Sequence, residues 1–419
     1  MYLTAGAKSL RDEVRAQLPD TLPRRLGVAV SGGGDSVALL DLLTGLAADE
    51  GTKLFAATVD HGLREGSSEE AAGVARLAER LDVPHEILRW KGWDGSGNLQ
   101  DQARQARYAL LTDWARQHDV EAVALGHTAD DQAETVLMRL ARSAGVTGLA
   151  AMPHQRMENG VLLVRPLLGI TRARLRDHLR ERGLSWAEDP SNRDLRFDRI
   201  KAREALAGLE PLGITAGTLA RVAQNMAQAR DALERCTQET ARRLVRIDAG
   251  DVLVDRSGFL ALPEEISRRL LVGIVNWIGG GTYPPRSGAV QHTLSAVNAD
   301  LPGVLGGCLV LPAGGVVRFC REYNAVRDIV AQPGQTWDRR WVITGPATQG
   351  AVVRALGEEG LRQVPDWRDT GRPYAVLSGT PAVWKGDEVL AAPLAGFANH
   401  WQAELPAGDE EFFAFLLSH

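Results

Sequence analysis

The feature that most constrains the fold of this chain is a short run that passes from apolar residues through glycines into a helical pattern. Residues 28–30 read Val-Ala-Val, typical of a buried strand, and residues 31–36 read Ser-Gly-Gly-Gly-Asp-Ser. Helical spacing of apolar residues begins at Val37. A strand that turns through glycines into a helix directs backbone N–H groups and a positive dipole end at one point. The run therefore predicts a site for phosphate or pyrophosphate.

The side chains of this loop have predicted roles at such a site. The glycines let the backbone approach an anion without a Cβ clash, and the two serines can add hydroxyl donors. Asp35 would repel a phosphate unless a cation lay between them, so it implies Mg²⁺. The alternative is an ordinary glycine-rich turn in which serine and aspartate cap the helix. The predicted nucleotide-binding residues are Ser31, Gly32, Gly33, Gly34, Asp35 and Ser36.

Two well-known phosphate loops fit this run poorly. A Walker A loop ends in Gly-Lys-Ser/Thr, and this loop has no lysine. A dinucleotide fingerprint would need glycine where Val37 stands. The run does match Ser-Gly-Gly-x-Asp-Ser, and so it resembles the signature of the PP-loop ATP pyrophosphatases. This resemblance implies cleavage of ATP between the α and β phosphates, adenylation of a substrate and release of pyrophosphate.

Length and composition are those of a soluble globular protein with more than one domain. A chain of 419 residues predicts two or three domains, and 44% hydrophobic and 24% charged residues are ordinary values. No run approaches the roughly 18 apolar residues of a membrane span, and the N-terminus does not have the layout of a secretory signal. Three widely spaced cysteines predict reduced thiols and a cytoplasmic location. The net charge of −5 argues only weakly against nucleic-acid binding.

Strand and helix patterns alternate from about residue 24 to about residue 190. Strands are expected at 28–30, 54–59, 83–88 and 121–125, and helices at 37–44, 67–81, 98–118 and 130–143. The alternation predicts an α/β fold with a doubly wound parallel sheet. In such sheets ligands bind at the carboxyl ends of the strands. The loop 31–36 should therefore share one crevice with Asp60, His61, Gly126 and His127.

A second group of charged residues follows the strand expected at 121–125. Asp131 and Glu134 lie three positions apart in the first turns of the next helix, so their carboxylates share one face. His127 lies just ahead of this helix. Paired carboxylates beside a triphosphate loop suit Mg²⁺ or an amine substrate. The alternative is an acidic first turn that favours the helix dipole, and this interpretation is preferred for Asp130.

Further segments resemble the bacterial tRNA(Ile)-lysidine synthetases. They are Asp-His-Gly-Leu-Arg at 60–64, Gln-Asp-Gln-Ala-Arg-Gln-Ala-Arg-Tyr at 100–108, Gly-His-Thr-Ala-Asp-Asp-Gln-Ala-Glu at 126–134, and Arg-Pro-Leu-Leu at 165–168 with Trp-Ala-Glu-Asp-Pro-Ser-Asn at 186–192. Their order and spacing after the loop also agree. The resemblance is dense over about 24–206 and thinner to about 330, where Gly306-Gly-Cys and Arg321-Glu322 weakly resemble a C-terminal module. Residues 335–419 show none.

The resemblance implies an ATP-dependent ligase with a PP-loop catalytic domain. Enzymes of this family adenylate carbon 2 of the wobble cytidine in the isoleucine tRNA with a CAU anticodon. Free L-lysine then displaces AMP. The product, lysidine, pairs with A instead of G and changes the identity of the tRNA from methionine to isoleucine. The implied cofactors are ATP as substrate and Mg²⁺, and the implied partners are this tRNA and free L-lysine.

The resemblance also implies roles for individual residues. Arg107 would neutralise the α-phosphate, and Arg199 would act around adenylation. His127 and the two carboxylates after it would surround the metal and the incoming lysine, and the proton acceptor is left open. The family usually has Asn where this chain has Ile200, although Arg203 falls where a basic residue is expected. The candidate catalytic residues are Asp35, Arg107, His127, Asp131, Glu134 and Arg199, and the candidate metal ligands are Asp35, Asp131 and Glu134.

The remainder of the chain is expected to bind tRNA. The catalytic domain is placed at 1–211, a helical or mixed tRNA-binding region at 212–334, and a smaller α+β module, also tRNA-binding, at 335–419. Short strands are expected within 245–262 and a helix over 266–278. Whether the basic face of the long helix after Pro211 is solvated or contacts tRNA phosphates is left open. The apolar residues at helical spacing in that helix are Leu219, Val222, Met226, Leu233 and Cys236.

Other functions fit the sequence less well. A PP-loop thiolase that transfers sulfur to tRNA would need catalytic or cluster-binding cysteines, and none precedes Cys236. A glutamine-dependent amidating synthetase would need an amidotransferase domain, and none is evident ahead of the loop. A non-catalytic tRNA-binding relative would have no need of Asp35, Asp131 and Glu134, and all three are present.

Overall fold

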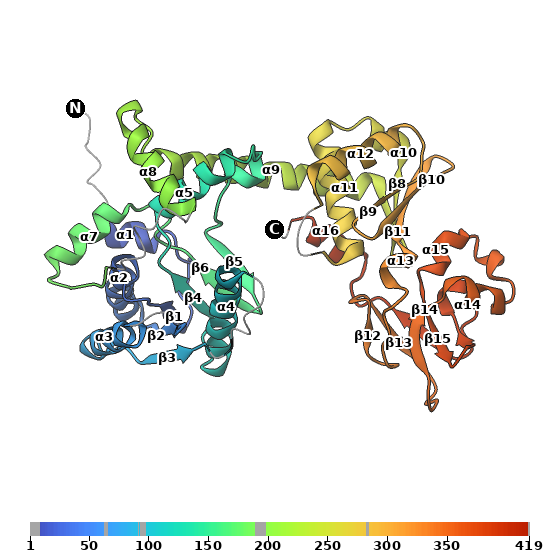
Figure 1. Ribbon diagram of the computed structural model, residues 1–419, viewed down its shortest axis with the longest axis horizontal. Coiled ribbons are helices and arrows are strands. Elements are labelled where there is room, and N and C mark those ends of the chain that lie inside the picture. Colours follow the sequence, from blue (N-terminus) through green and yellow to red (C-terminus); the bar gives the residue numbers. More distant parts are fainter. Residues whose placement is uncertain are drawn as a thin grey trace. The chain divides into compact units, whose positions relative to one another are not determined.

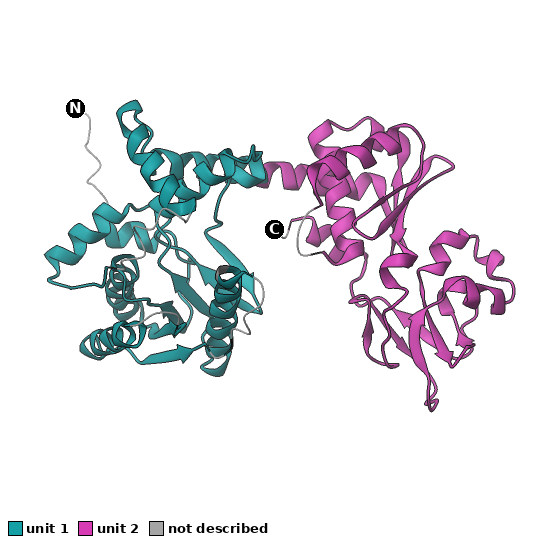
Figure 2. Ribbon diagram, viewed as in Figure 1, with its two compact units in different colours: residues 1–230 teal, residues 231–419 magenta. Residues whose placement is uncertain are grey.

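The computed structural model describes residues 9–62, 66–90, 92, 98–188, 198–281 and 285–417. The chain forms two compact units, residues 1–230 and 231–419 (Figure 2). The boundary between them lies within helix α9 (Ala216–Leu244). The domain limits expected from the sequence, at 211 and 334, stay predictions. None of the helices in the described part of the chain combines the length and apolar character that a membrane span requires.

The first unit is built on a six-stranded sheet with the strand order β3-β2-β1-β4-β6-β5 (Figure 1). Its strands are β1 (Arg25–Ala29), β2 (Lys53–Asp60), β3 (His85–Arg89), β4 (Ala122–Leu125), β5 (Gln155–Glu158) and β6 (Val161–Val164). All neighbours pair in parallel except the edge strand β5, which is antiparallel to β6. The predicted parallel sheet is confirmed, and the hairpin of β5 and β6 is an addition that the sequence analysis did not predict.

Two apolar cores lie on opposite faces of this sheet, because successive residues of a strand point to opposite sides. In β2, Leu54 and Ala56 face one core, whereas Phe55 and Ala57 face the other. The first core is covered by α2 (Gly34–Glu50), α3 (Ser67–Arg80) and α7 (Arg172–Glu181), with α1 (Leu10–Arg15) beside them, and the second by α4 (Leu99–Gln117). Helices on both faces confirm the doubly wound arrangement.

Helix α5 (Ala129–Leu140) follows β4 directly and packs against α8 (Asp198–Leu209). Helix α6 (Val146–Leu149) and the 3-10 turn η2 (Glu210–Leu212) complete this helical part. The inner side of α8 buries Ile200, Ala202 and Leu206. Ile200 therefore packs in the interior, which accounts for an apolar residue where the family usually has Asn.

Helix α9 is present as predicted, but its expected apolar stripe is wrong at two positions. Val222 is 40% exposed, and Cys236 is also exposed. The buried positions of the helix are small or polar instead: Ala223, Glu234, Thr237, Thr240 and Ala241. The buried side of this helix is thus lined mainly by small and polar side chains rather than by a row of large apolar ones.

The second unit begins with a five-stranded antiparallel sheet of order β7-β8-β11-β10-β9. Its strands are β7 (Val245–Asp248), β8 (Asp251–Asp255), β9 (Gly303–Leu305), β10 (Cys308–Ala313) and β11 (Val316–Arg321), and its helices are α10 (Arg256–Leu260), α11 (Glu264–Gly279), α12 (Ser287–Asn298) and α16 (Asp409–Phe415). The strands and the helix expected over 245–262 and 266–278 are present. Helix α10 lies where the sequence predicted short strands, so that expectation is wrong over 256–260, and the strands β9 to β11 were not predicted.

The C-terminal part of this unit holds two small sheets, β12-β13-β17 and β14-β15-β16. Buried tryptophans, among them Trp337 and Trp384, fill its two cores. Its elements are α13 (Tyr323–Val326), β12 (Thr336–Trp337), β13 (Trp341–Thr344), β14 (Val352–Ala355), α14 (Gly357–Gln363), η3 (Trp367–Thr370), α15 (Tyr374–Ser378), β15 (Pro381–Lys385), β16 (Glu388–Ala391), η4 (Pro393–Ala395) and β17 (Gln402–Glu404). The expected α+β character of the C-terminal module is confirmed.

The close approach of β1 to α4 gives a direct test of the packing. A Cβ on Gly27 would lie 2.9 Å from Cζ3 of Trp114. We expect Gly27→Val to lower the free energy of unfolding by about 1–3 kcal/mol through overpacking, measured by urea denaturation. Gly208→Ala in α8 is the control, since no heavy atom lies within 4 Å of its added Cβ and alanine favours a helix. A Gly27→Val protein as stable as the parent would contradict this packing.

Candidate active site

The glycine-rich loop joins β1 to the first turn of α2, at the carboxyl end of the strand. Gly32 has a φ of 88°, a conformation that favours glycine. The hydroxyl of Ser36 donates to the carbonyl of Gly33 (2.9 Å) and accepts from the N–H of Ser31 (3.1 Å). Ser36 therefore braces the loop from inside, whereas Ser31 is exposed and lines the adjacent cavity.

Two other segments fix the position of this loop. The N–H of Ala187 donates to the carbonyl of Gly32 (2.9 Å), and a Cβ on Gly34 would lie 3.3 Å from Trp186. On another side, a Cβ on Gly126 would lie 3.2 Å from the backbone N and Cα of Ser36. The segments that follow β1 and β4 therefore lie against each other, as predicted. Residues 189–192, which complete the motif predicted at 186–192, lie outside the described residues.

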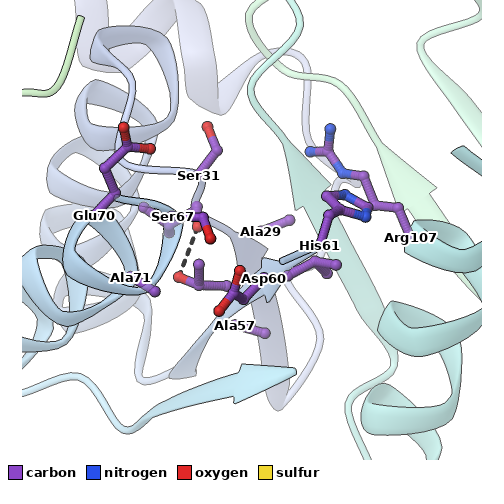
Figure 3. A pocket seen from close by; sticks show the side chains of 12 residues that line it. Ala29, Ser31, Ala57, Asp60, His61, Ser67, Glu70, Ala71 and Arg107 are labelled. Carbon is purple, nitrogen blue, oxygen red and sulfur yellow. Dashed lines mark hydrogen bonds between the residues drawn. The ribbon is translucent and has the colours of Figure 1, made fainter. Parts of the chain in front are cut away.

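A cavity of about 330 Å³ opens beside the loop, at the carboxyl ends of β1 and β2 (Figure 3). The cavity is lined by small side chains, including Ala57 and Ala71, together with polar groups. Figure 3 shows His61 and Arg107 next to each other at one end of the cavity. The sequence analysis did not single out several of its lining residues: Thr58, Ser67, Glu70 and Ala71. Of these, Thr58 lies on β2 and the other three lie in the first turns of α3.

The N-terminus of α5 is closed by a capping box. Oδ2 of Asp131 accepts from the N–H of Thr128 (2.8 Å) and from its hydroxyl (2.9 Å). Oδ2 of the neighbouring Asp130 accepts from the backbone N–H of Arg172 (2.8 Å), at the first turn of α7. Both aspartates therefore have structural partners, and Asp130 joins α5 to α7.

Three carboxylates converge on the guanidinium of Arg172. Its Nε donates to Oδ2 of Asp35 (3.1 Å), one terminal nitrogen to Oδ1 of Asp131 (2.6 Å), and the other to Oε1 of Glu134 (2.8 Å). Burial acts to lower the pKa of Arg172, but the carboxylates outweigh it, so this pKa lies above its usual value. The structure thus brings together three predicted site residues. Arg172, which the sequence analysis did not single out, bridges them.

Glu134 is the most buried of the three, with a side chain that is 1% exposed. Its Oε1 also accepts from Nε of Arg203 (3.0 Å). Its Oε2 is buried and has no hydrogen-bond partner among the residues that the structure describes. Arg199 is exposed on α8 and acts electrostatically on both His127 and Asp131. Oε2 of Glu134 is therefore a buried acceptor whose hydrogen-bonding capacity is unused within the described residues.

Burial and the neighbouring arginines together shift the pKa values of the groups in and around this cluster. It lowers the pKa of His127 to about 3, and Arg107 adds to the effect, so the imidazole is neutral. Burial raises the pKa of Asp35, against the opposing effect of Arg172. Burial also acts to raise the pKa of Asp131, but Arg172 and the N–H of Thr128 outweigh it, so this pKa is lowered.

The three predicted metal ligands surround a guanidinium. Within the described ranges, no group of three or more His, Cys, Asp or Glu side chains is placed to hold a metal ion by itself. Mg²⁺ is usually bound by one or two carboxylates together with substrate phosphates. Asp35 fits such a site, because it lies in the loop and is the most exposed of the three carboxylates, at 25%.

Comparison with known proteins gives consistent matches. A family model described as a PP-loop domain matches residues 7–209. The tRNA(Ile)-lysidine synthase of Ruegeria pomeroyi is 61% identical over 419 residues, which is 100% of both chains. That of Wolbachia pipientis is 34% identical over 88% of both chains, and that of Rhodopseudomonas palustris 43% identical over 65% of this chain and 79% of its own. Among solved structures, the U34-tRNA thiolase NcsA of Methanococcus maripaludis covers 52% of this chain and 76% of that chain, with 18% identity and a TM-score of 0.46.

The low pKa of His127 predicts a dependence of stability on pH. The group titrates near 6.5 when unfolded and near 3 when folded, so the unfolded chain binds the proton first. Its stabilising contribution is therefore complete above about pH 6.5 and is lost as the pH falls toward 3. We expect the unfolding midpoint in urea to fall less from about pH 7 to about pH 5 in His127→Asn than in the parent. Equal falls in both proteins would show that the imidazole is not held neutral.

Proposed function

This chain belongs to the tRNA(Ile)-lysidine synthase family, and we propose that it is itself an ATP-dependent ligase with this activity. In the proposed reaction, the carbonyl oxygen on carbon 2 of the wobble cytidine attacks the α-phosphorus of ATP, and pyrophosphate leaves. An amine of free L-lysine then attacks carbon 2, and AMP leaves as the carbon–nitrogen bond forms. The observation that carries this proposal is the meeting of Asp35, from the phosphate loop, with Asp131 and Glu134 in one cluster.

The first step needs a bound triphosphate and a stabilised leaving group. The loop before α2 supplies backbone N–H groups and a helix N-terminus for the phosphates. The neighbouring cavity is of a size to hold part of the nucleoside, and Arg107 lines it as a cation for the α-phosphate. Mg²⁺, which Asp35 would hold together with the phosphates, would neutralise the negative charge of the pyrophosphate.

The second step needs an acceptor for the proton of the lysine ammonium. A general base works best when its pKa lies near the working pH, and His127, with a pKa of about 3, is a weak base. Both oxygens of Asp131 are already hydrogen-bonded, whereas Oε2 of Glu134 is free within the described residues. We therefore assign Glu134 as the residue that binds the lysine amine and accepts its proton. Asp131 would assist as a neighbouring negative charge.

Basic and aromatic surfaces support binding of a CAU-anticodon isoleucine tRNA. Exposed arginines line α9, where phosphate contacts would be salt-dependent: Arg221, Arg235 and Arg243. In the C-terminal module, Arg368 lies 4.5 Å over the ring of Trp367, and Trp367 contacts the 45%-exposed Tyr374 edge to face. Arginine and aromatic groups together suit unpaired bases. A tRNA substrate and three free cysteines fit a cytoplasmic location.

The structure adds an argument against sulfur transfer. Cys308 and Cys320 are buried, and burial raises the pKa of both thiols, that of Cys308 to about 12. A thiol with so high a pKa is a poor nucleophile, because the thiolate is the reactive form. A non-catalytic tRNA-binding role fits poorly as well, because the buried carboxylates are retained in one cluster beside the loop.

The direct test is incubation of the purified protein with ATP, labelled lysine and a transcript of isoleucine tRNA with a CAU anticodon. We expect ATP-dependent incorporation of lysine, and none into an elongator methionine tRNA transcript. Asp35→Asn is the matched control, because it keeps the shape of the side chain and removes its charge. It should lower the rate by about 100-fold or more. Absence of incorporation by the parent protein would contradict the proposed function.

A further inference from the structure

We propose that Arg172 is a positioning residue of this site. Its guanidinium is the counter-ion that holds the carboxylates of Asp35, Asp131 and Glu134 in one cluster and presents Glu134 to the incoming amine. This inference rests on the proposed function, because it places the amine of lysine at the cluster. It assigns a role to a side chain that contacts no reacting atom.

The backbone at Arg172 is anchored from several directions. Its N–H donates to Asp130 (2.8 Å), and the carbonyl of Ile170 accepts from the N–H of Ala129 (2.9 Å). Further along α7, Leu175 and Leu179 are fully buried in the core below the helix. The side chain therefore extends from a rigid base, so its guanidinium can impose positions on the carboxylates.

The shape of the guanidinium suits three separate partners. Each nitrogen donates to a different carboxylate, with distances of 3.1 Å to Asp35, 2.6 Å to Asp131 and 2.8 Å to Glu134. A planar fork with five N–H donors can span three acceptors, whereas the ammonium of lysine is a compact point charge. The contacts also connect the phosphate loop to α5, because Asp35 belongs to the loop and Asp131 and Glu134 belong to the helix.

Charge balance in the cluster depends on this side chain. Carboxylates that are removed from water are costly unless they are paired. Of the three carboxylates, Arg203 forms an ion pair within the described residues with that of Glu134 alone (3.0 Å). Arg199 acts electrostatically on Asp131 without a direct ion pair in the described structure. Without Arg172, Asp35 and Asp131 would lose their guanidinium contacts, and the three like charges would repel one another. Glu134 would then no longer be held in its present position.

The experiment compares Arg172→Ala and Arg172→Lys with Arg174→Ala. The control residue lies on the same helix and also loses an ion pair, to the partly exposed Glu13 (2.8 and 2.9 Å). Lysine KM and tRNA-dependent pyrophosphate release are measured separately. We expect Arg172→Ala to raise the lysine KM by about 10- to 100-fold, with a smaller effect on pyrophosphate release. Arg172→Lys should recover part of the loss, and Arg174→Ala should resemble the parent.

Chemical rescue separates this role from a merely structural one. Millimolar guanidinium chloride should lower the lysine KM of Arg172→Ala and leave that of Arg174→Ala unchanged, because the added ion can occupy the space of the missing group. An unchanged KM in a folded Arg172→Ala protein, or a raised KM that guanidinium does not lower, overturns the inference while the proposed function stands. If the parent incorporates no lysine, both fail together.

Discussion

The close approach of β4 to the first turn of α2 determines where the other parts of the catalytic unit lie. Gly126 makes it possible, because any Cβ there would lie 3.2 Å from the backbone of Ser36. In a parallel sheet, the segments that follow neighbouring strands leave from the same edge. The phosphate loop after β1 and the acidic helix after β4 therefore become neighbours, although about 90 residues separate them in the chain.

Within that arrangement, chemically similar groups have different environments. Both carboxylate oxygens of Asp131 accept hydrogen bonds, one in the capping box and the other from Arg172. Glu134, in contrast, has one buried oxygen without a hydrogen-bond partner in the described structure. His127 is held neutral by burial and by nearby arginines. Under the proposed function, a site of this kind would separate the binding of phosphate, at a helix N-terminus, from the binding of a cationic amine, at buried carboxylates. These are the two functions that an adenylating ligase for an amine requires.

The sequence predicted the parts of this site whose signals are local. The alternating strands, the loop at 31–36 and the acidic start of α5 follow from patterns within a few residues. Arg172 could not be found in this way, because its carboxylate partners lie 38 to 137 residues away. Among the strands that were missed, β9 has only three residues, and β10 contains a proline, which argues against a strand within a sheet. The stripe predicted on α9 was wrong at Val222 and Cys236, which are exposed, because the buried positions there are taken by small residues such as Ala223 and Ala241.

Under the proposed function, Glu134 acts in the use of lysine and not in the activation of tRNA. The most direct measurement follows tRNA-dependent pyrophosphate release and lysine incorporation side by side in the parent and in Glu134→Gln. We expect Glu134→Gln to release pyrophosphate within a few-fold of the parent and to lose lysine incorporation by about 100-fold or more even at saturating lysine. Equal incorporation in the two proteins at saturating lysine would contradict it.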